Sequence, residues 1–475
     1  MPQRFLKSDL IDYNNCKKSA WLKRNDHEVV NWPKQTAFEQ ILAMDGYVAE
    51  DLAQNMLSSL FPNDTLKFQF EFNDENGHFT RSDIVRFLSE QEIEIYEVKA
   101  SSSLKKNGNT DPIVDACFQA FVAEHAGYTV SKIAVILVNK NFIKKAVFAP
   151  SDVLVIEDIT EKFHETRNNI ETNLSEMREY LARENIDRDG CECIQKPSAS
   201  NHCDSFDYFN PDIPEGSIFL LPGLRSKKHN ELMDSGFMKL KDVPSDELSS
   251  SRHKKIRDAA ESETPQVNLD KIRSFIDDMS WPIHFYDYET VRSIIPILNG
   301  AKPSNQIPTQ YSLHILQKNG SLEHFEFLSE NLGQQIDLIE HMKKSFKATG
   351  SVVSWNKPFE NGCNETLASI YPEHAKFLND ITFRTVDLMD VFKEDYVDIR
   401  FGGSISIKKV LPVLCPHISY NEDAIHEGAG AMAAWLNFVN LQDINEKNRI
   451  RSELKDYCEL DSLAMVEIFK FLSNL

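Results

Sequence analysis

Two acidic residues, Asp287 and Glu289, stand one residue apart in the apolar, aromatic stretch "IHFYDYETV". In a β-strand, alternate side chains point to the same face, so these two carboxylates are expected to lie side by side. Burying two like charges together is unfavourable unless a cation lies between them. The pair therefore predicts a cation between the two carboxylates, with further ligands elsewhere in the chain.

Two later motifs offer those ligands. The stretch "NKPFE" ends at Glu360, and "YCELDSLAM" contains Tyr457 and Asp461. The last two residues are four apart, which places them one turn apart on the same face of a helix. Several carboxylates around two divalent ions, about 4 Å apart, stabilise the attacking and leaving oxygens of phosphoryl transfer. Asp387 and Asp390 in "TVDLMDVF" are alternatives to Glu360.

A second set of charged residues lies earlier in the chain. Asp83 falls in one apolar strand-like run, "RSDIVRF", and the next run, "IYEVKA", contains Glu97 and Lys99 on one face. Two carboxylates that hold a divalent metal, with a lysine that orients or activates water, suit phosphodiester cleavage. This set predicts a second metal-dependent site.

Four cysteines are grouped at the two ends of this first region. Cys16 stands early, whereas Cys191, Cys193 and Cys203 follow a long charged segment. Four thiolates are the right number for a [4Fe-4S] cluster or for structural zinc, and the absence of any metal also stays open. The remaining cysteines are interpreted as isolated core residues: Cys117, Cys363, Cys415 and Cys458.

The elements that must position these residues follow from hydrophobic periodicity. The pattern predicts helices over 36–60, 112–127 and 159–185, and strands over 66–72, 81–88, 92–100 and 132–139. A second α/β unit is expected to begin with the strand that contains Asp287. Between the two, residues 209–278 are mixed in character and predict a mainly helical connector, in which 220–243 would suit a small helical hairpin.

The totals limit the class of protein. With 475 residues, two or three domains are expected at ~150 residues each, and 41% hydrophobic residues allow packed cores. The chain has no run of about 18 apolar residues and no secretion signal at its start, which favours a cytoplasmic protein that does not span a membrane. The net charge of −21 argues against nonspecific nucleic-acid binding, although a local basic groove would be enough for a nuclease.

The first 205 residues resemble the RecB-like branch of the PD-(D/E)XK nucleases, which includes CRISPR-associated exonucleases. The resemblance implies that Glu50, in "GYVAE", occupies the position of a metal-binding histidine and that Gln119, in "DACFQAF", is the helical glutamine of the site. It also implies an iron–sulfur cluster that joins the two ends of the domain through the four grouped cysteines. The Cys-x-Cys spacing and the glutamate in place of histidine depart from the family pattern.

The C-terminal part resembles DEDDy exonucleases, which have an RNase H-like (DnaQ-type) fold. The resemblance implies that Asp287, Glu289, Glu360 and Asp461 bind two divalent metals, Mg²⁺ or Mn²⁺, and that Tyr457 positions water. Glu360 departs from the family, whose second motif ends in Asp. In "GGSISIKKVLP", Lys408 and Lys409 are predicted contacts to phosphate, with a solvated face as the alternative. The combined order resembles a bacterial family of proteins of unknown function.

We therefore expect an α/β protein with a RecB-like nuclease domain (1–208), a connector (209–278) and a DEDDy exonuclease-like domain (279–475). The predicted function is metal-dependent hydrolysis of phosphodiester bonds, with 3′→5′ polarity in the second domain. DNA is favoured over RNA as the substrate, and both stay open. The alternative is a nucleic-acid-binding adaptor in which one or both sites are degenerate. The sequence names no protein partner.

Overall fold

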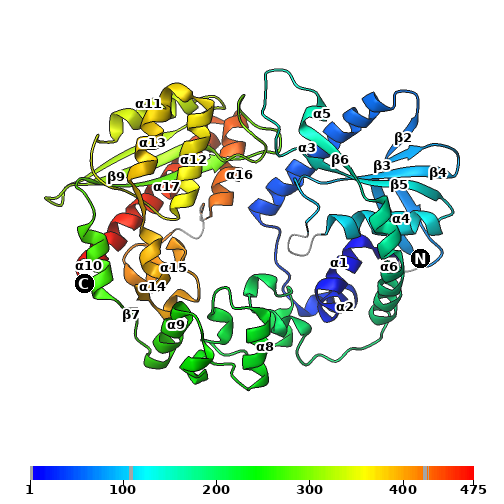
Figure 1. The fold of residues 1–475 in the computed structure, drawn as a ribbon, viewed down its shortest axis with the longest axis horizontal. Coiled ribbons are helices and arrows are strands. Elements are labelled where there is room, and N and C mark those ends of the chain that lie inside the picture. The colour runs from blue at the N-terminus through cyan, green and yellow to red at the C-terminus, as the bar shows by residue number, and fades with distance from the viewer. Residues whose placement is uncertain (1–3, 106–110, 421–424, 426) are drawn as a thin grey trace. The chain divides into compact units, whose positions relative to one another are not determined.

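A computed structural model describes residues 4–105, 111–420, 425 and 427–475. The chain folds into two compact α/β units, residues 1–213 and 214–475 (Figure 1). Each unit has its own main sheet and its own helices. Among the described residues, no helix is both long enough and apolar enough to cross a membrane.

The first unit is built on a mixed sheet. Its strands are β1 (Phe5–Leu6), β2 (Thr65–Asn73), β3 (His78–Phe87), β4 (Glu92–Val98), β5 (Thr129–Val138) and β6 (Leu154–Asp158). They pair in the order β1-β3-β4-β5-β6, and β2 also pairs with β3. The pairing of β4 with β5 is parallel, whereas β2, β3 and β4 form an antiparallel meander.

Helices surround this sheet and include those expected from periodicity. They are α1 (Lys7–Asn15), α2 (Lys17–Asn25), α3 (Ala37–Leu60), α4 (Pro112–His125), α5 (Pro150–Val153), α6 (Thr160–Leu181) and α7 (Phe206–Phe209). Thr36 and Glu39 form a capping box at the start of α3, which explains why the helix begins where the sequence predicts. Helix α4 packs on the sheet and α6 packs on α4, so α4 is nearly buried along its length.

The residues predicted as a connector mostly lie in the second unit and have a small hydrophobic core. They contain α8 (Ser226–Asp234), α9 (Ser251–Ser262), β7 (Gln266–Val267) and α10 (Leu269–Asp277). Leu221, Leu232 and Leu240 are buried together in this core. Residues 220–243, all described, contain one α-helix followed by the 3-10 turn Leu240–Asp242, so this stretch is not a hairpin of two α-helices.

The second unit has a five-stranded sheet in the order β10-β9-β8-β11-β12. The strands are β8 (Ile283–Val291), β9 (Ile307–Leu316), β10 (Leu322–Leu328), β11 (Val352–Ser354) and β12 (Thr385–Asp387). Strands β8, β9 and β10 form an antiparallel meander, and β11 and β12 run parallel to β8. A two-residue strand, β13 (Tyr396–Val397), pairs with β7.

Helices cover both faces of this sheet (Figure 1). One face packs against α11 (Gln335–Ser345), α12 (Lys357–Ile370) and α13 (Ala375–Arg384). The other packs against α15 (Ile407–Leu414) and α17 (Ile444–Ser473), and the unit also contains α14 (Val391–Glu394) and α16 (Gly428–Asn440). The alternation of β8 explains this arrangement, because Phe285 faces α17 while Tyr286 and Tyr288 face α11 and α12.

Candidate metal centres

The carboxylate pair of strand β8 lies in an acidic cluster. Asp287 and Glu289 project from β8 and meet Asp461 of α17, and oxygens of the three carboxylates all lie within 4.8 Å of one another. Helix α17 is held over the sheet because Gln310 of β9 donates a side-chain hydrogen bond of 2.9 Å to the Leu454 carbonyl. The residues that the sequence placed in one site therefore come together from segments about 170 residues apart.

Glu360 approaches the same cluster from α12. Its side chain is buried, its Oε2 makes no hydrogen bond among the described residues, and its charge acts on the Asp287 carboxyl. Farther along α12, Asn364 anchors the helix to the sheet through hydrogen bonds with the Tyr286 and Tyr288 hydroxyls, at 3.1 and 3.0 Å. Glu360 is thus a buried acid with an unused oxygen, as expected of a metal ligand.

The two alternatives to Glu360 have other partners. The Asp387 carboxylate accepts hydrogen bonds from the backbone N–H groups of Asn356 and Lys357, both at 3.0 Å, at the start of α12. Asp390 is exposed and forms an ion pair of 2.5 Å with Lys393. Asp387 therefore holds the helix that contains Glu360, and Asp390 lies at the surface.

Burial and mutual repulsion favour the protonated forms of these acids. Burial, with the charges of Asp461 and Glu289, raises the pKa of Asp287 well above its usual value. Burial and Asp461 raise the pKa of Glu289 in the same way, and burial with the charges of Asp387 and Asp461 raises that of Glu360 to about 8. Bound cations would reverse these shifts, because they favour the ionised carboxylates.

Two tyrosines and a lysine border the acidic cluster. The Tyr457 hydroxyl accepts a hydrogen bond of 2.7 Å from Lys408 Nζ, and the Tyr420 hydroxyl donates one of 2.5 Å to Asp461. The Lys408 ammonium also lies 4.8 Å from the centre of the Tyr457 ring. Of the two predicted phosphate contacts, Lys408 is thus bound at the site itself, whereas Lys409 is exposed. The sequence analysis did not single out Tyr420, which stands outside any motif.

The donor set decides which ions fit. The ligands are carboxylate oxygens, which suit hard cations such as Mg²⁺ and Mn²⁺. The unused Oε2 of Glu360 and the raised carboxyl pKa values both indicate a site that is short of positive charge. The residues present therefore fit a divalent metal site.

In the first unit, Glu97 and Lys99 form the predicted pair within a larger buried network. Lys99 Nζ donates to Glu97 at 2.8 Å and to Asp115 at 2.6 Å, and Gln119 donates to the second Glu97 oxygen. Lys7 adds a second ammonium 3.3 Å from Glu97. Burial alone would raise the pKa of Glu97, but Lys7 and Lys99 outweigh it and hold the pKa below its usual range.

Lys7 and Asp115 were not expected from the sequence. Asp115 precedes Gln119 by four residues, a spacing that places both on one face of α4 and could have revealed it. Lys7 belongs to α1, at the start of the chain, and no local pattern connects it with Glu97. Its role follows only from the folded structure.

Asp83 and Glu50 are bridged by Gln69. The Gln69 amide donates to Glu50 and, at 3.3 Å, to Asp83. Gln69 stands across the sheet from Asp83 with φ of +51°, a conformation that costs a non-glycine residue energy. Burial and the charge of Glu97 raise the pKa of Asp83 to about 8.

The described residues contain three groups whose ligand atoms all lie within 4.8 Å of one another, and Glu50, Asp83 and Glu97 are not one of them. Asp83 and Glu97 do interact, since the charge of Glu97 raises the pKa of Asp83. The structure thus brings the predicted residues of the first unit into one neighbourhood, with Glu50 turned to Gln69.

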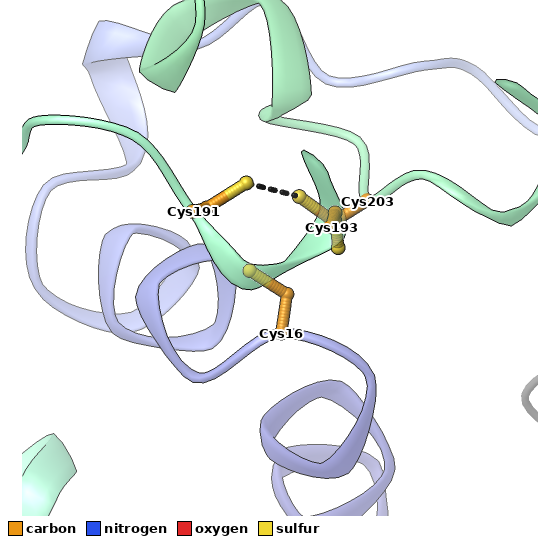
Figure 2. A group of neighbouring side chains, drawn as sticks. All are labelled: Cys16, Cys191, Cys193 and Cys203. Carbon is orange, nitrogen blue, oxygen red and sulfur yellow. Dashed lines mark hydrogen bonds between the residues drawn. The ribbon is translucent and has the colours of Figure 1, made fainter. Parts of the chain in front are cut away.

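The four grouped cysteines meet at a single point. Cys16 lies between α1 and α2, and the other three come from the turns after α6, as Figure 2 shows. The thiols of Cys16, Cys191, Cys193 and Cys203 all lie within 4.8 Å of one another and all four residues are buried. The remaining cysteines belong to no such group among the described residues.

The surroundings of the thiols suit a metal centre. The Asn210 amide donates to the Cys191 sulfur at 3.4 Å, and N–H donors of this kind stabilise metal-bound thiolates. Cys191 and Cys203 have sulfurs 3.9 Å apart, and tetrahedral zinc with Zn–S bonds of about 2.3 Å places its sulfurs about 3.8 Å apart. A cubane binds cysteines at four outward corners, so it would require wider spacing.

Comparisons with known proteins give one matching domain and two similar proteins. Residues 284–406 match a family described as "Domain of unknown function (DUF2779)". The chain is 30% identical over 213 residues to "Uncharacterized protein MG366" of Mycoplasma genitalium, an alignment that covers 40% of this chain and 32% of that protein. It is 26% identical over 273 residues to the Mycoplasma pneumoniae homologue, with coverage of 48% and 40%.

The chain thus contains a DUF2779 domain and spans less than half the length of these two curated relatives. No solved structure matches it. The matched domain runs from the second residue of β8 past β12 and contains three of the candidate acidic ligands, Asp287, Glu289 and Glu360, whereas Asp461 and Tyr457 lie beyond its last residue.

Proposed function

We propose that this protein is a divalent-metal-dependent nuclease whose principal site is the acidic cluster of the second unit. The observation that carries the proposal is the convergence of the Asp287, Glu289 and Asp461 carboxylates within 4.8 Å. A buried acid, Glu360, and a tyrosine, Tyr457, border the cluster. Carboxylates that cannot all ionise without cations are suited to a pair of divalent ions.

The fold supports the same class of protein. The strand order β10-β9-β8-β11-β12, with β9 antiparallel to the other strands, suits an RNase H-like fold. In the first unit, the order α3-β2-β3-β4-α4-β5 suits a PD-(D/E)XK fold, with Asp83 and Glu97 on adjacent strands. The substrate class is nucleic acid, with 3′→5′ polarity in the second unit, by analogy with DEDDy exonucleases.

The residues of the second unit would act as follows. Asp287, Glu289, Asp461 and Glu360 would hold two ions, which stabilise the attacking and leaving oxygens when bound. Lys408 donates a hydrogen bond to the Tyr457 oxygen, and Tyr457 also forms a side-chain hydrogen bond with Asp461, so this hydroxyl is held beside the acid, where it would orient a water or a phosphate oxygen once ions bind. Tyr420 donates a hydrogen bond to one oxygen of Asp461 and so orients this carboxylate.

The test is hydrolysis of single- and double-stranded DNA and RNA with Mg²⁺ or Mn²⁺. Asp287→Asn removes one ligand charge and should lower 3′→5′ trimming roughly 10³-fold or more. Asp390→Asn, which changes an exposed acid of the same unit, is the matched control. Trimming at the wild-type rate by Asp287→Asn would show that the acidic cluster is structural.

The geometry of the first unit favours a second candidate, a nucleic-acid-binding module without cleavage there. Glu50 is bound to Gln69, and Lys99 is engaged by two carboxylates. If the first unit only binds nucleic acid, the single variant Asp287→Asn should release no product with any divalent metal. The double variant Asp287→Asn/Lys99→Ala should still bind nucleic acid. If instead Asp287→Asn still cleaves and the added Lys99→Ala change abolishes that cleavage, the first unit is a nuclease.

The cysteine group is proposed to hold a structural metal that ties α1 and α2 to the turns after α6. The four buried thiols fit either zinc or a [4Fe-4S] cluster in ligand type and number. Their close spacing favours a single tetrahedral ion. Elemental analysis of anaerobically purified wild type and Cys16→Ser distinguishes a loss of one zinc from a loss of four irons per chain.

A further inference from the structure

A second group of metal-ligating side chains lies on the same sheet, apart from the acidic cluster. His314 of β9 and His324 of β10 are directly paired across the two strands, and Glu459 of α17 lies beside them. Their ligand atoms all lie within 4.8 Å of one another. His314 is buried, whereas the side chains of His324 and Glu459 are 26% and 44% exposed, so solvent reaches the group.

A hydrogen-bond chain fixes which nitrogen of each imidazole is protonated. The Glu459 carbonyl can only accept, so the Ser462 hydroxyl donates its single hydrogen to it, at 3.0 Å. Ser462 Oγ must then accept from His314 Nδ1 at 2.8 Å and from the Ser312 hydroxyl at 2.7 Å. Ser312 Oγ in turn accepts from His324 Nε2 at 2.9 Å.

This chain leaves a lone pair on His314 Nε2 and another on His324 Nδ1. His324 Nδ1 lies 3.6 Å from a Glu459 carboxylate oxygen, too far for a hydrogen bond. Two acceptors that face each other at this distance repel, and a cation between them would remove the repulsion. Imidazoles whose second nitrogen is held by a hydrogen bond are also the form in which histidine binds metals.

We propose that His314, His324 and Glu459 form a binding site for a divalent transition-metal ion, with Zn²⁺ as the best fit. Two imidazoles and one carboxylate are a common zinc donor set that leaves a fourth position open. Imidazole nitrogen disfavours Mg²⁺, so this site differs in metal preference from the acidic cluster. It does not depend on the proposed nuclease function.

Binding requires one local movement. The two imidazole rings are stacked, with centroids 4.4 Å apart and planes 20° apart, so their in-plane lone pairs do not yet converge. His324 lies on the edge strand of the sheet and is partly exposed, so its ring can turn toward the ion. The bound ion would join β9 and β10 to α17 two residues before Asp461, and would fix the helix that supplies that acid.

The test is zinc binding by the full chain, measured by equilibrium dialysis at buffered free Zn²⁺ followed by elemental analysis. His324→Gln and Glu459→Gln should each bind one zinc fewer than the wild type, or bind it at least about 10-fold more weakly. His417→Gln, which alters an exposed histidine of the same unit, should match the wild type. Excess Mg²⁺ should not displace this zinc.

Wild-type zinc stoichiometry and affinity in both variants would overturn the proposal, as would an equal loss in His417→Gln. Because Glu459 is half exposed, Glu459→Gln is expected to fold even if His324→Gln does not, and it then decides the outcome alone. Zinc at the cysteine group is unaffected by these substitutions, so the difference between variants counts only this site. Nuclease activity enters neither readout.

Discussion

Glu360 should make the metal-free protein less stable as the pH rises. Its pKa is about 8 in the folded chain, against an ordinary value of 4.5, because burial and the charges of Asp387 and Asp461 disfavour the ionised form. The unfolded chain therefore loses this proton first. The associated stability is complete below pH 4.5 and is lost as the pH rises to about 8.

The size of the effect follows from the two pKa values. Between pH 5 and pH 8, Glu360 should lower the free energy of unfolding by roughly 3 to 4 kcal/mol. Glu360→Gln should remove this pH-dependent loss. A buried amide without partners also destabilises the variant, but by the same amount at both pH values, so it cancels in the comparison.

The assay is urea unfolding at pH 5 and pH 8 in the presence of a chelator. Glu365→Gln, an exposed change on the same helix, should keep the wild-type pH dependence. Mn²⁺ at pH 8 should restore stability to the wild type and less to Glu360→Gln, because the ion binds only the folded chain. If Glu360→Gln and wild type lose equal stability between the two pH values, Glu360 is not a buried member of the acidic cluster.

Three further changes test the other sites. Lys408→Met should tighten Mn²⁺ binding several-fold in calorimetric titration, because it removes a positive charge beside the acids. Lys409→Met changes an exposed lysine and should leave the affinity unchanged. Equal effects of the two changes would contradict the placement of Lys408 at the acidic cluster. Lys99→Met should lower the free energy of unfolding by about 3 kcal/mol, because the buried Glu97 and Asp115 carboxylates then keep Lys7 but lose the Lys99 ammonium. A urea transition like that of Lys105→Met, which changes an exposed lysine, would refute this. Cys16→Ser should lower the metal content of the purified chain, whereas Cys117→Ser, which lies outside the cysteine group, should leave the metal content unchanged. An unchanged metal content in both variants would exclude the cysteine centre.

The local elements were predictable because they depend on short-range patterns. The helix expected over 36–60 is α3, and the strand expected at "IHFYDYETV" is β8 with the same bounds. A capping box and an alternating apolar strand are both encoded within a few residues, so the sequence is enough to find them. The pairing of Asp287 with Glu289 on one face follows from the same alternation.

Tertiary structure alone decided which distant groups meet. Glu360 rather than Asp387 is the buried acid with an unused oxygen, because the Asp387 carboxylate accepts hydrogen bonds from the N–H groups at the start of α12. Tyr420 and Lys7 join their sites through packing that no local spacing encodes. Sequence fixes a residue's chemistry and its face on an element, whereas its partners, burial and pKa depend on neighbours brought from far along the chain.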